Sequence, residues 1–261
     1  MTTIRPAAVA GQFYPENRTR LRETVRSYLN AADAHRLRPK ALIVPHAGYI
    51  YSGPVAASGY AQLEPLRTKI GRVVLLGPSH FVPFEGLAVS SADLFRTPLG
   101  DVAIDTESVR DLLTLPQVQL LDAAHAREHS LEVQLPFLQE VLNDFLLVPI
   151  VVGDASVDDV AEVIDRLWDG PETLFVISSD LSHYHDASTA KQLDRETSLA
   201  ITAMRSEDLN GGRACGYKPI SGLLRVARRR GMQVHIIDLR NSGDTAGSAD
   251  RVVGYGAYVI E

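Results

Sequence analysis

Short apolar runs alternate with amphipathic stretches along almost all of the 261 residues, and this alternation constrains the fold more than any other feature. The apolar runs are typical of buried β-strands, and amphipathic stretches between such runs are typical of helices that cover a sheet. The runs are ALIVPH, RVVLLGPSH, GLAVSS, DFLLVPIVVGD, TLFVISSD, QVHIIDLR and VGYGAYVI. The pattern predicts an α/β fold built on a mostly parallel sheet.

Helical spacing fills the stretches between these runs, and several of them begin with a residue that caps helices well. Gly231 follows the last of them, where glycine commonly ends a helix. No repeat, low-complexity tract or linker interrupts the pattern, and the length suits one large α/β domain, so we expect a single domain over 1–261. The helices are expected at 17–32, 106–113, 130–142, 156–168, 188–204 and 220–230.

Composition limits the classes of partner. A net charge of -6 and a pI near 5.8 leave no basic surface of the kind that binds nucleic acid or anionic membranes. The single cysteine, Cys215, excludes an intramolecular disulfide and a cluster of thiolate ligands. No run approaches the roughly 20 apolar residues of a membrane span, and the N-terminus lacks the apolar core of a signal peptide. We therefore expect a cytoplasmic protein whose partner is a small molecule or another protein, with no nucleic acid and no membrane.

Four histidines lie at the ends of apolar runs or next to them. His46 occurs in ALIVPHAGY, His80 in VVLLGPSHF, His129 in REHSLEVQLPF and His183 in LFVISSDLSHYH. In an open α/β sheet, ligands bind beyond the carboxyl ends of the strands, so residues that follow different strands converge there. The pattern predicts one assembled site, although each histidine alone is also compatible with an ordinary loop residue bonded to the backbone.

Two strand-end histidines and one strand-end carboxylate form the ligand set of a 2-His-1-carboxylate iron site. Asp244, in the turn NSGD after the run QVHIIDLR, is the candidate carboxylate, with a solvated loop position as its alternative. Zinc accepts the same ligands, so the residue types do not choose the metal.

Further polar residues accompany these histidines. Asp180 precedes His183 by three residues and can orient its imidazole, or it can cap the following turn. Glu132 follows His129 by three residues at the start of the expected helix 130–142, so both can face one pocket or simply cap that helix. Cys215 is either a nucleophile or an inert, pocket-lining thiol, and the second reading is favoured because no base lies near it in sequence.

The sequence His125-Ala-Arg-Glu128-His129 matches the H-x-x-E-H pattern of inverted zincin proteases. In those enzymes two histidines one helical turn apart bind zinc, and the glutamate is the general base. Ser130 resembles the N-cap of the expected helix, which would place both histidines on irregular chain. A zinc hydrolase is therefore a remote alternative.

Several ordered motifs resemble the Memo family, whose bacterial and archaeal members are often called AmmeMemoRadiSam system protein B. The resemblance covers nearly the whole chain. The motifs are RPAAVAGQFYP, PHAGYIYSG, LLGPSH, EHSLEVQLPFL, SSDLSHY and CGYKPI. The resemblance implies a fold like that of class III extradiol dioxygenases, with a central mixed sheet flanked by helices on both faces. It also implies a metal site in a cleft at the strand ends.

The resemblance also implies roles for single residues. His46 and His80 match the family's metal-binding histidines, His183 matches an acid/base histidine, and His129 matches a further histidine of the cleft. In animal members the third ligand is a cysteine, and counting back from the terminal VVGYGAYV places Asp244 at that position. The residues expected in the pocket or behind the ligands are Asp180, Glu132, Cys215 and Tyr49.

These observations predict a mononuclear metalloenzyme, with Fe(II) as the expected metal and zinc or copper as alternatives. His183 would move protons and His129 would stabilise a bound anion, as in a dioxygenase-like oxidoreductase of unknown substrate. The competing class is a non-catalytic protein that binds a peptide or a partner in the cleft. For prokaryotic members the family name implies AMMECR1-like and radical SAM proteins as partners.

Overall fold

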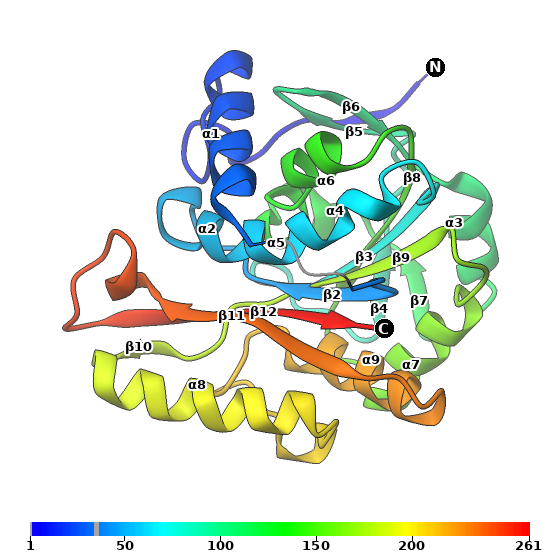
Figure 1. The fold of residues 1–261 in the computed structure, drawn as a ribbon. Helices are drawn as coiled ribbons and strands as arrows, with labels where there is room; N and C mark the ends of the chain where they lie inside the picture. Colours follow the sequence, from blue (N-terminus) through cyan, green and yellow to red (C-terminus); the bar gives the residue numbers. More distant parts are fainter. Residues whose placement is uncertain (1, 34–36) are drawn as a thin grey trace.

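The structure is a computed structural model that describes residues 2–33 and 37–261. Its larger sheet is mixed, and helices cover both of its faces, which confirms the predicted α/β class (Figure 1). The strands of this sheet are β2 (Ala41–Val44), β3 (Arg72–Pro78), β4 (Leu87–Val89), β7 (Val118–Leu120), β8 (Leu146–Val152), β9 (Thr173–Ser178), β10 (His183–His185), β11 (Val234–Asn241) and β12 (Val252–Ile260). A smaller sheet contains β1 (Ile4–Arg5), β5 (Leu94–Thr97) and β6 (Gly100–Ala103).

The centre of the larger sheet is parallel. Its strand order is β10-β12-β2-β9-β3-β8-β4-β7, with β11 paired to β12. Strand β9 lies between β2 and β3 and is parallel to both, and β8 continues the parallel set beyond β3. Strands β12 and β4 flank this set in the antiparallel direction. The carboxyl ends of β2, β9 and β3 therefore meet at one edge.

Figure 1 shows α1, α2 and α6 on one face of the sheet and α7, α8 and α9 on the other. The central strands are buried under both layers, which explains their nearly continuous apolar sequences. The helices are α1 (Arg18–Ala31), α2 (Tyr49–Tyr60), α3 (Thr106–Leu112), α4 (Asp122–Ala126), α5 (His129–Glu132), α6 (Leu135–Val141), α7 (Val157–Arg166), α8 (Ala187–Thr202) and α9 (Tyr217–Arg229), with short 3-10 turns η1 (Ala61–Leu66), η2 (Ser206–Asp208) and η3 (Ser242–Asp244).

The single helix expected over 130–142 is wrong, because the chain forms two short helices, α5 and α6, at this place. Pro136 has no N–H to donate to the carbonyl of Glu132, so a continuous helix would lose a hydrogen bond here. The N-cap of the first helix is Glu128 rather than Ser130, since the Glu128 side chain accepts from the Ser130 amide.

Helix α2 was not predicted from the sequence. It contains Gly53, Pro54 and Gly59, which are poor helix formers, and it has no clear apolar stripe. Close packing explains the glycines: a Cβ at Gly53 would lie 2.6 Å from the ring of Tyr28, and one at Gly59 would lie 2.8 Å from Val44. The helix is buried on most of its surface, so amphipathic spacing is absent.

Within the described residues, no helix is both long and apolar enough to cross a bilayer.

Candidate metal centre

Strand ends bring two of the expected ligands together. His46 lies two residues beyond β2, and His80 lies two residues beyond β3. Ser178, the last residue of β9, lies between them because β9 pairs with both strands. Cys215 enters from the loop that precedes α9. Residues far apart in the sequence thus meet at one edge of the sheet.

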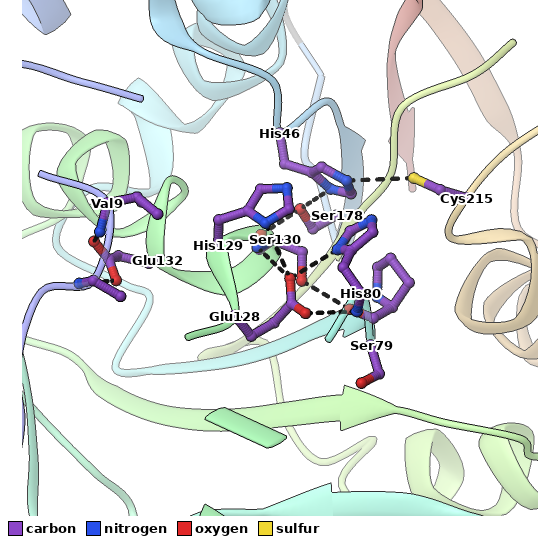
Figure 2. Close-up of polar contacts among 12 residues, drawn as sticks. Val9, His46, Ser79, His80, Glu128, His129, Ser130, Glu132, Ser178 and Cys215 are labelled. Atoms are coloured by element: carbon purple, nitrogen blue, oxygen red, sulfur yellow. Dashed lines mark hydrogen bonds and ion pairs between the residues drawn. The ribbon is translucent and has the colours of Figure 1, made fainter. Parts of the chain in front are cut away.

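His46, His80 and Cys215 form a compact set of ligand atoms. One potential ligand atom of each lies within 4.8 Å of the others, and His46 Nε2 is 3.3 Å from Cys215 Sγ (Figure 2). The imidazole rings of His46 and His80 lie 5.2 Å apart, nearly perpendicular to each other. Two imidazoles and a thiol at this spacing are a donor set for a transition metal.

Ser178 fixes the tautomer of His46. Its hydroxyl donates to the carbonyl of Ser130 at 2.6 Å and accepts from the Gln134 amide at 2.8 Å. Because its one proton is already used, this oxygen accepts the 2.9 Å bond from His46 Nδ1–H. The lone pair of His46 is therefore at Nε2, which faces Cys215.

Glu128 fixes the tautomer of His80 in the same way. Its buried carboxylate accepts from His80 Nδ1 at 2.8 Å, from the His80 amide at 2.7 Å and from the Ser130 amide at 2.9 Å. Burial opposes the charge, but the hydrogen bonds from His80 outweigh it and lower the pKa of Glu128 to about 2. A carboxylate behind a histidine orients the ring and makes its other nitrogen a stronger metal ligand. Sequence reasoning placed Glu128 only in the zincin motif and missed this role.

The environment of Cys215 favours the neutral thiol in the absence of a metal. The Asp180 amide donates to its sulfur at 3.3 Å. Burial, together with the nearby Asp180 carboxylate, raises the pKa of the thiol to about 12 without metal. Since the thiolate is the metal-binding form, a cation would displace this proton. The donors present therefore fit a transition metal.

The structure does not bring Asp244, the expected third ligand, to this cluster. Its carboxylate accepts from the Asn241 amide at 3.0 Å and lies 3.4 Å from Lys191 Nζ, at the turn η3. The Asp244 side chain thus completes the capping box of η3, whose N-cap is Asn241, and pairs with a surface lysine. Cys215 stands where the carboxylate was expected, and the 2-His-1-carboxylate set becomes a 2-His-1-Cys set.

His129 lies against the cluster. Its ring stacks on His80 at 4.5 Å, and the ring of Phe13 lies 4.6 Å from it on another side. Burial and the neighbouring His46 lower the pKa of His129 to about 4, so it is neutral near pH 7. Its Nδ1 is buried without a hydrogen-bond partner among the described residues, 3.5 Å from Glu128. The side chain retains a nitrogen lone pair close to the ligands.

His183 begins β10, which pairs with β12, and it is half-buried. It lies near enough for its charge to affect the pKa values of Asp180 and His46. Asp180 itself is buried behind the ligands, where its carboxylate accepts from the His46 amide at 2.7 Å. Burial raises the pKa of Asp180.

Two expected pocket residues have other contacts. The Tyr49 hydroxyl is buried and donates to the Val133 carbonyl at 2.6 Å. Glu132 is fully buried and turned away from the histidines toward Val9, as Figure 2 shows. It forms an ion pair with Arg5 and accepts from Tyr14. Both side chains therefore hold neighbouring segments of the chain together.

The zincin pair is separated. His125 lies in α4, and its Nε2 is 3.1 Å from the carbonyl of Ala88. His129 begins a different helix, α5. Among the described residues, His125 belongs to no group that could hold a metal, whereas Glu128 and His129 form a second such group with His80.

A family model and several relatives agree on one family. Residues 5–259 match the family model described as Memo-like protein. A "MEMO1 family protein" of Aquifex aeolicus is 36% identical over 97% of each chain, and one of Sulfolobus acidocaldarius is 37% identical over 97% of each. A Methanosarcina barkeri relative is 35% identical over 99% of this chain and all of its own. A crystal structure of an uncharacterized protein from Escherichia coli K12 overlaps with a TM-score of 0.48 and 15% identity, covering 84% of this chain and 99% of that one.

Proposed function

Because the chain belongs to the Memo family and gathers two imidazoles and a thiol at the strand ends, we propose that it is a mononuclear transition-metal oxidoreductase. His46, His80 and Cys215 hold the metal, and iron and copper are the candidates. The observation that carries this proposal is the mutual approach of the three ligand atoms, with the opposite nitrogen of each histidine already hydrogen-bonded.

The donor set favours a metal that accepts sulfur. A thiolate beside two imidazoles suits copper, zinc or iron better than magnesium or calcium, which prefer oxygen ligands. Three protein ligands also leave positions for a substrate, as catalytic metal sites require. A bound iron or copper would supply one-electron chemistry and orient a chelating substrate.

Two further histidines, His129 and His183, are the candidate proton carriers near these ligands. Burial keeps His129 neutral near pH 7, so it can hydrogen-bond a bound anion through its ring N–H. His183 lies near enough to Asp180 to influence the pKa of that carboxyl group. We assign proton transfer to His183 and support of a bound anion to His129. The rings of Phe13 and Phe81 flank His129 and limit access of water to it.

Hydrolysis of the zincin type has less support. Such a mechanism needs a carboxylate free to deprotonate water, but Glu128 already accepts three hydrogen bonds. His125, its expected zinc ligand, is bonded to the backbone. These contacts favour imidazole-mediated proton transfer over carboxylate-assisted attack by water.

Metal retention and oxygen uptake test the proposal together. Protein prepared without oxygen and reconstituted separately with iron, copper or zinc is dialysed, and its metal content is measured. Oxygen uptake is then followed with a panel of catechols. We expect near-stoichiometric iron or copper and metal-dependent uptake. Retention of zinc alone, or uptake that is equal in metal-free protein, would contradict the proposal.

A matched pair of variants tests the proton carrier. His183→Gln should keep the metal but reduce kcat by about 100-fold, because it cannot exchange a proton. His185→Gln changes an exposed histidine of the same strand and should leave kcat unchanged. Equal loss in both variants would remove the role assigned to His183.

A further inference from the structure

A separate cavity of about 270 Å³ opens beside the ligand cluster, on the side of Cys215. Its wall includes Cys215 itself and Ser79, the residue before His80. Figure 2 shows Cys215 on the side of the histidines opposite Glu132. Most of the remaining wall is apolar, with Phe84 and Tyr217 as its aromatic members. A molecule that fills this cavity would therefore lie against Cys215.

One charged pair stands in the wall of the cavity. Among the described lining residues, Lys218 is the only cation and Asp154 the only carboxylate. The two form an ion pair, and Lys218 Nζ also lies 3.4 Å from the Gly153 carbonyl. The Lys218 side chain is 20% exposed, whereas that of Asp154 is 75% exposed. The cation is therefore held in the wall, while its carboxylate partner reaches it from solvent.

We propose that this cavity binds a small organic carboxylate with an apolar body, whose carboxylate replaces that of Asp154 on Lys218. After the exchange the lysine is still paired with one carboxylate. The Asp154 side chain can rotate into solvent because it is already exposed. Transfer of the apolar body from water to the cavity wall formed by Phe84 and Tyr217 makes the free energy of binding more favourable. A single lysine in an apolar wall suits a monoanion better than a phosphate, which usually needs several donors or an arginine.

As a statement about substrate class, the inference rests on the proposed function, because the cavity shares Cys215 with the metal ligands. Binding of a carboxylate does not itself require turnover. Carboxylate binding in the cavity and metal-dependent turnover can therefore be tested and rejected separately.

Calorimetric titration with benzoate tests the inference, using both metal-free and cobalt-loaded protein. Benzamide serves as the neutral ligand of the same shape, and inorganic phosphate as the anion without an apolar body. We expect benzoate to bind about tenfold or more tightly than either. In the cobalt protein, benzoate should also shift the thiolate-to-cobalt absorption band, because the ligand lies against Cys215.

Three variants locate the binding. Lys218→Met should weaken benzoate binding by about tenfold or more, whereas Asp154→Asn should tighten it severalfold by removing the competing carboxylate. Lys191→Met removes an exposed lysine that is paired with Asp244 away from the cavity, and should change nothing. Tighter binding in Asp154→Asn is decisive, since loss of a merely structural ion pair would not produce it.

The inference is overturned by equal binding of benzoate and benzamide, by phosphate binding as well as benzoate, or by no benzoate binding at all. It is also overturned when Lys218→Met binds benzoate normally or when Asp154→Asn fails to tighten it. If Lys218→Met does not fold, the ligand comparison on the unaltered protein and Asp154→Asn still decide. If the protein retains no metal after reconstitution but still binds benzoate, the proposed function fails and the cavity assignment stands.

Discussion

At the scale of single residues, the ligand cluster depends on acceptors that hold each histidine in one tautomer. Ser178 accepts from His46 Nδ1, and Glu128 accepts from His80 Nδ1. Both bonds place the free lone pair at Nε2. A change behind a ligand should therefore alter metal affinity although no ligand is lost.

Glu128→Gln tests this dependence. Because both carboxylate oxygens accept from N–H groups, the new NH₂ group must oppose one of these donors. We expect metal affinity to fall by about 10- to 100-fold, measured by competition with a chelator. Glu107→Gln, at an exposed position of α3, is the control and should bind normally. Unchanged affinity in Glu128→Gln would show that the carboxylate does not position His80.

The sequence predicted some residues of the cluster and not others. His46 and His80 could be predicted because both follow parallel strands, whose carboxyl ends always share an edge. The third member of the cluster, Cys215, could not be predicted, since its approach to the histidines depends on the path of two loops. Cys215 lies two residues before α9, which begins at Tyr217 and not at the predicted 220, so the predicted helix start left the thiol in a longer loop.

At the scale of elements, α5 connects the site to the N-terminal segment. His129 begins this helix beside the ligands, and Glu132 ends it, facing the opposite way. The buried Glu132 carboxylate accepts from the amides of Ala8 and Val9 and from the Tyr14 hydroxyl, and it pairs with Arg5. This segment continues to Phe13, which packs on His129. One short helix therefore fixes both a wall of the site and the chain behind it.

Glu132→Gln should destabilise the protein strongly. The substitution leaves the buried Arg5 guanidinium without its counter-charge, and breaking a buried pair in this way costs about 3 kcal/mol or more. Urea unfolding measures the loss. Asp101→Asn breaks the exposed pair with Arg96 and should cost much less. Similar losses in both variants would mean that Glu132 does not anchor the segment.

Elements were predictable where the spacing was regular. The central strands β2, β3, β8 and β9 were found because buried parallel strands have continuous apolar sequences. The short strands β1, β5, β6, β7 and β10 were not predicted. The break before α6 and the whole of α2 were missed, since Pro136 interrupts a helical pattern and α2 is buried by small residues rather than by one apolar stripe.

At the scale of the whole molecule, several histidines are kept neutral inside the fold. Burial lowers the pKa of His46 to about 3 and those of His125 and His129 to about 4. Unfolded histidine has a pKa near 6.5, so between about pH 6.5 and 4 the unfolded chain binds more protons than the folded protein. Stability from these groups is therefore present above pH 6.5 and is lost as the pH falls.

His125→Gln isolates one of these groups without touching the ligands. For each histidine held neutral, the free energy of unfolding falls by about 1.4 kcal/mol for each unit by which the pH is lowered in this range. Metal-free protein should therefore lose stability between pH 6.5 and 5, and the variant should lose less by about this amount per pH unit. Asp180 and Asp194, whose pKa values are raised by burial, act in the opposite direction, so the difference between the two proteins is the relevant quantity. Identical slopes in urea unfolding would contradict this account.

The central claim is the identity of the three ligands, and the absorption spectrum of the cobalt-loaded protein tests it most directly. We predict a thiolate-to-cobalt band in the unaltered protein that disappears in Cys215→Ser and persists in Asp244→Asn. A band that survives in Cys215→Ser, or cobalt binding lost in Asp244→Asn, would contradict the His46, His80 and Cys215 centre.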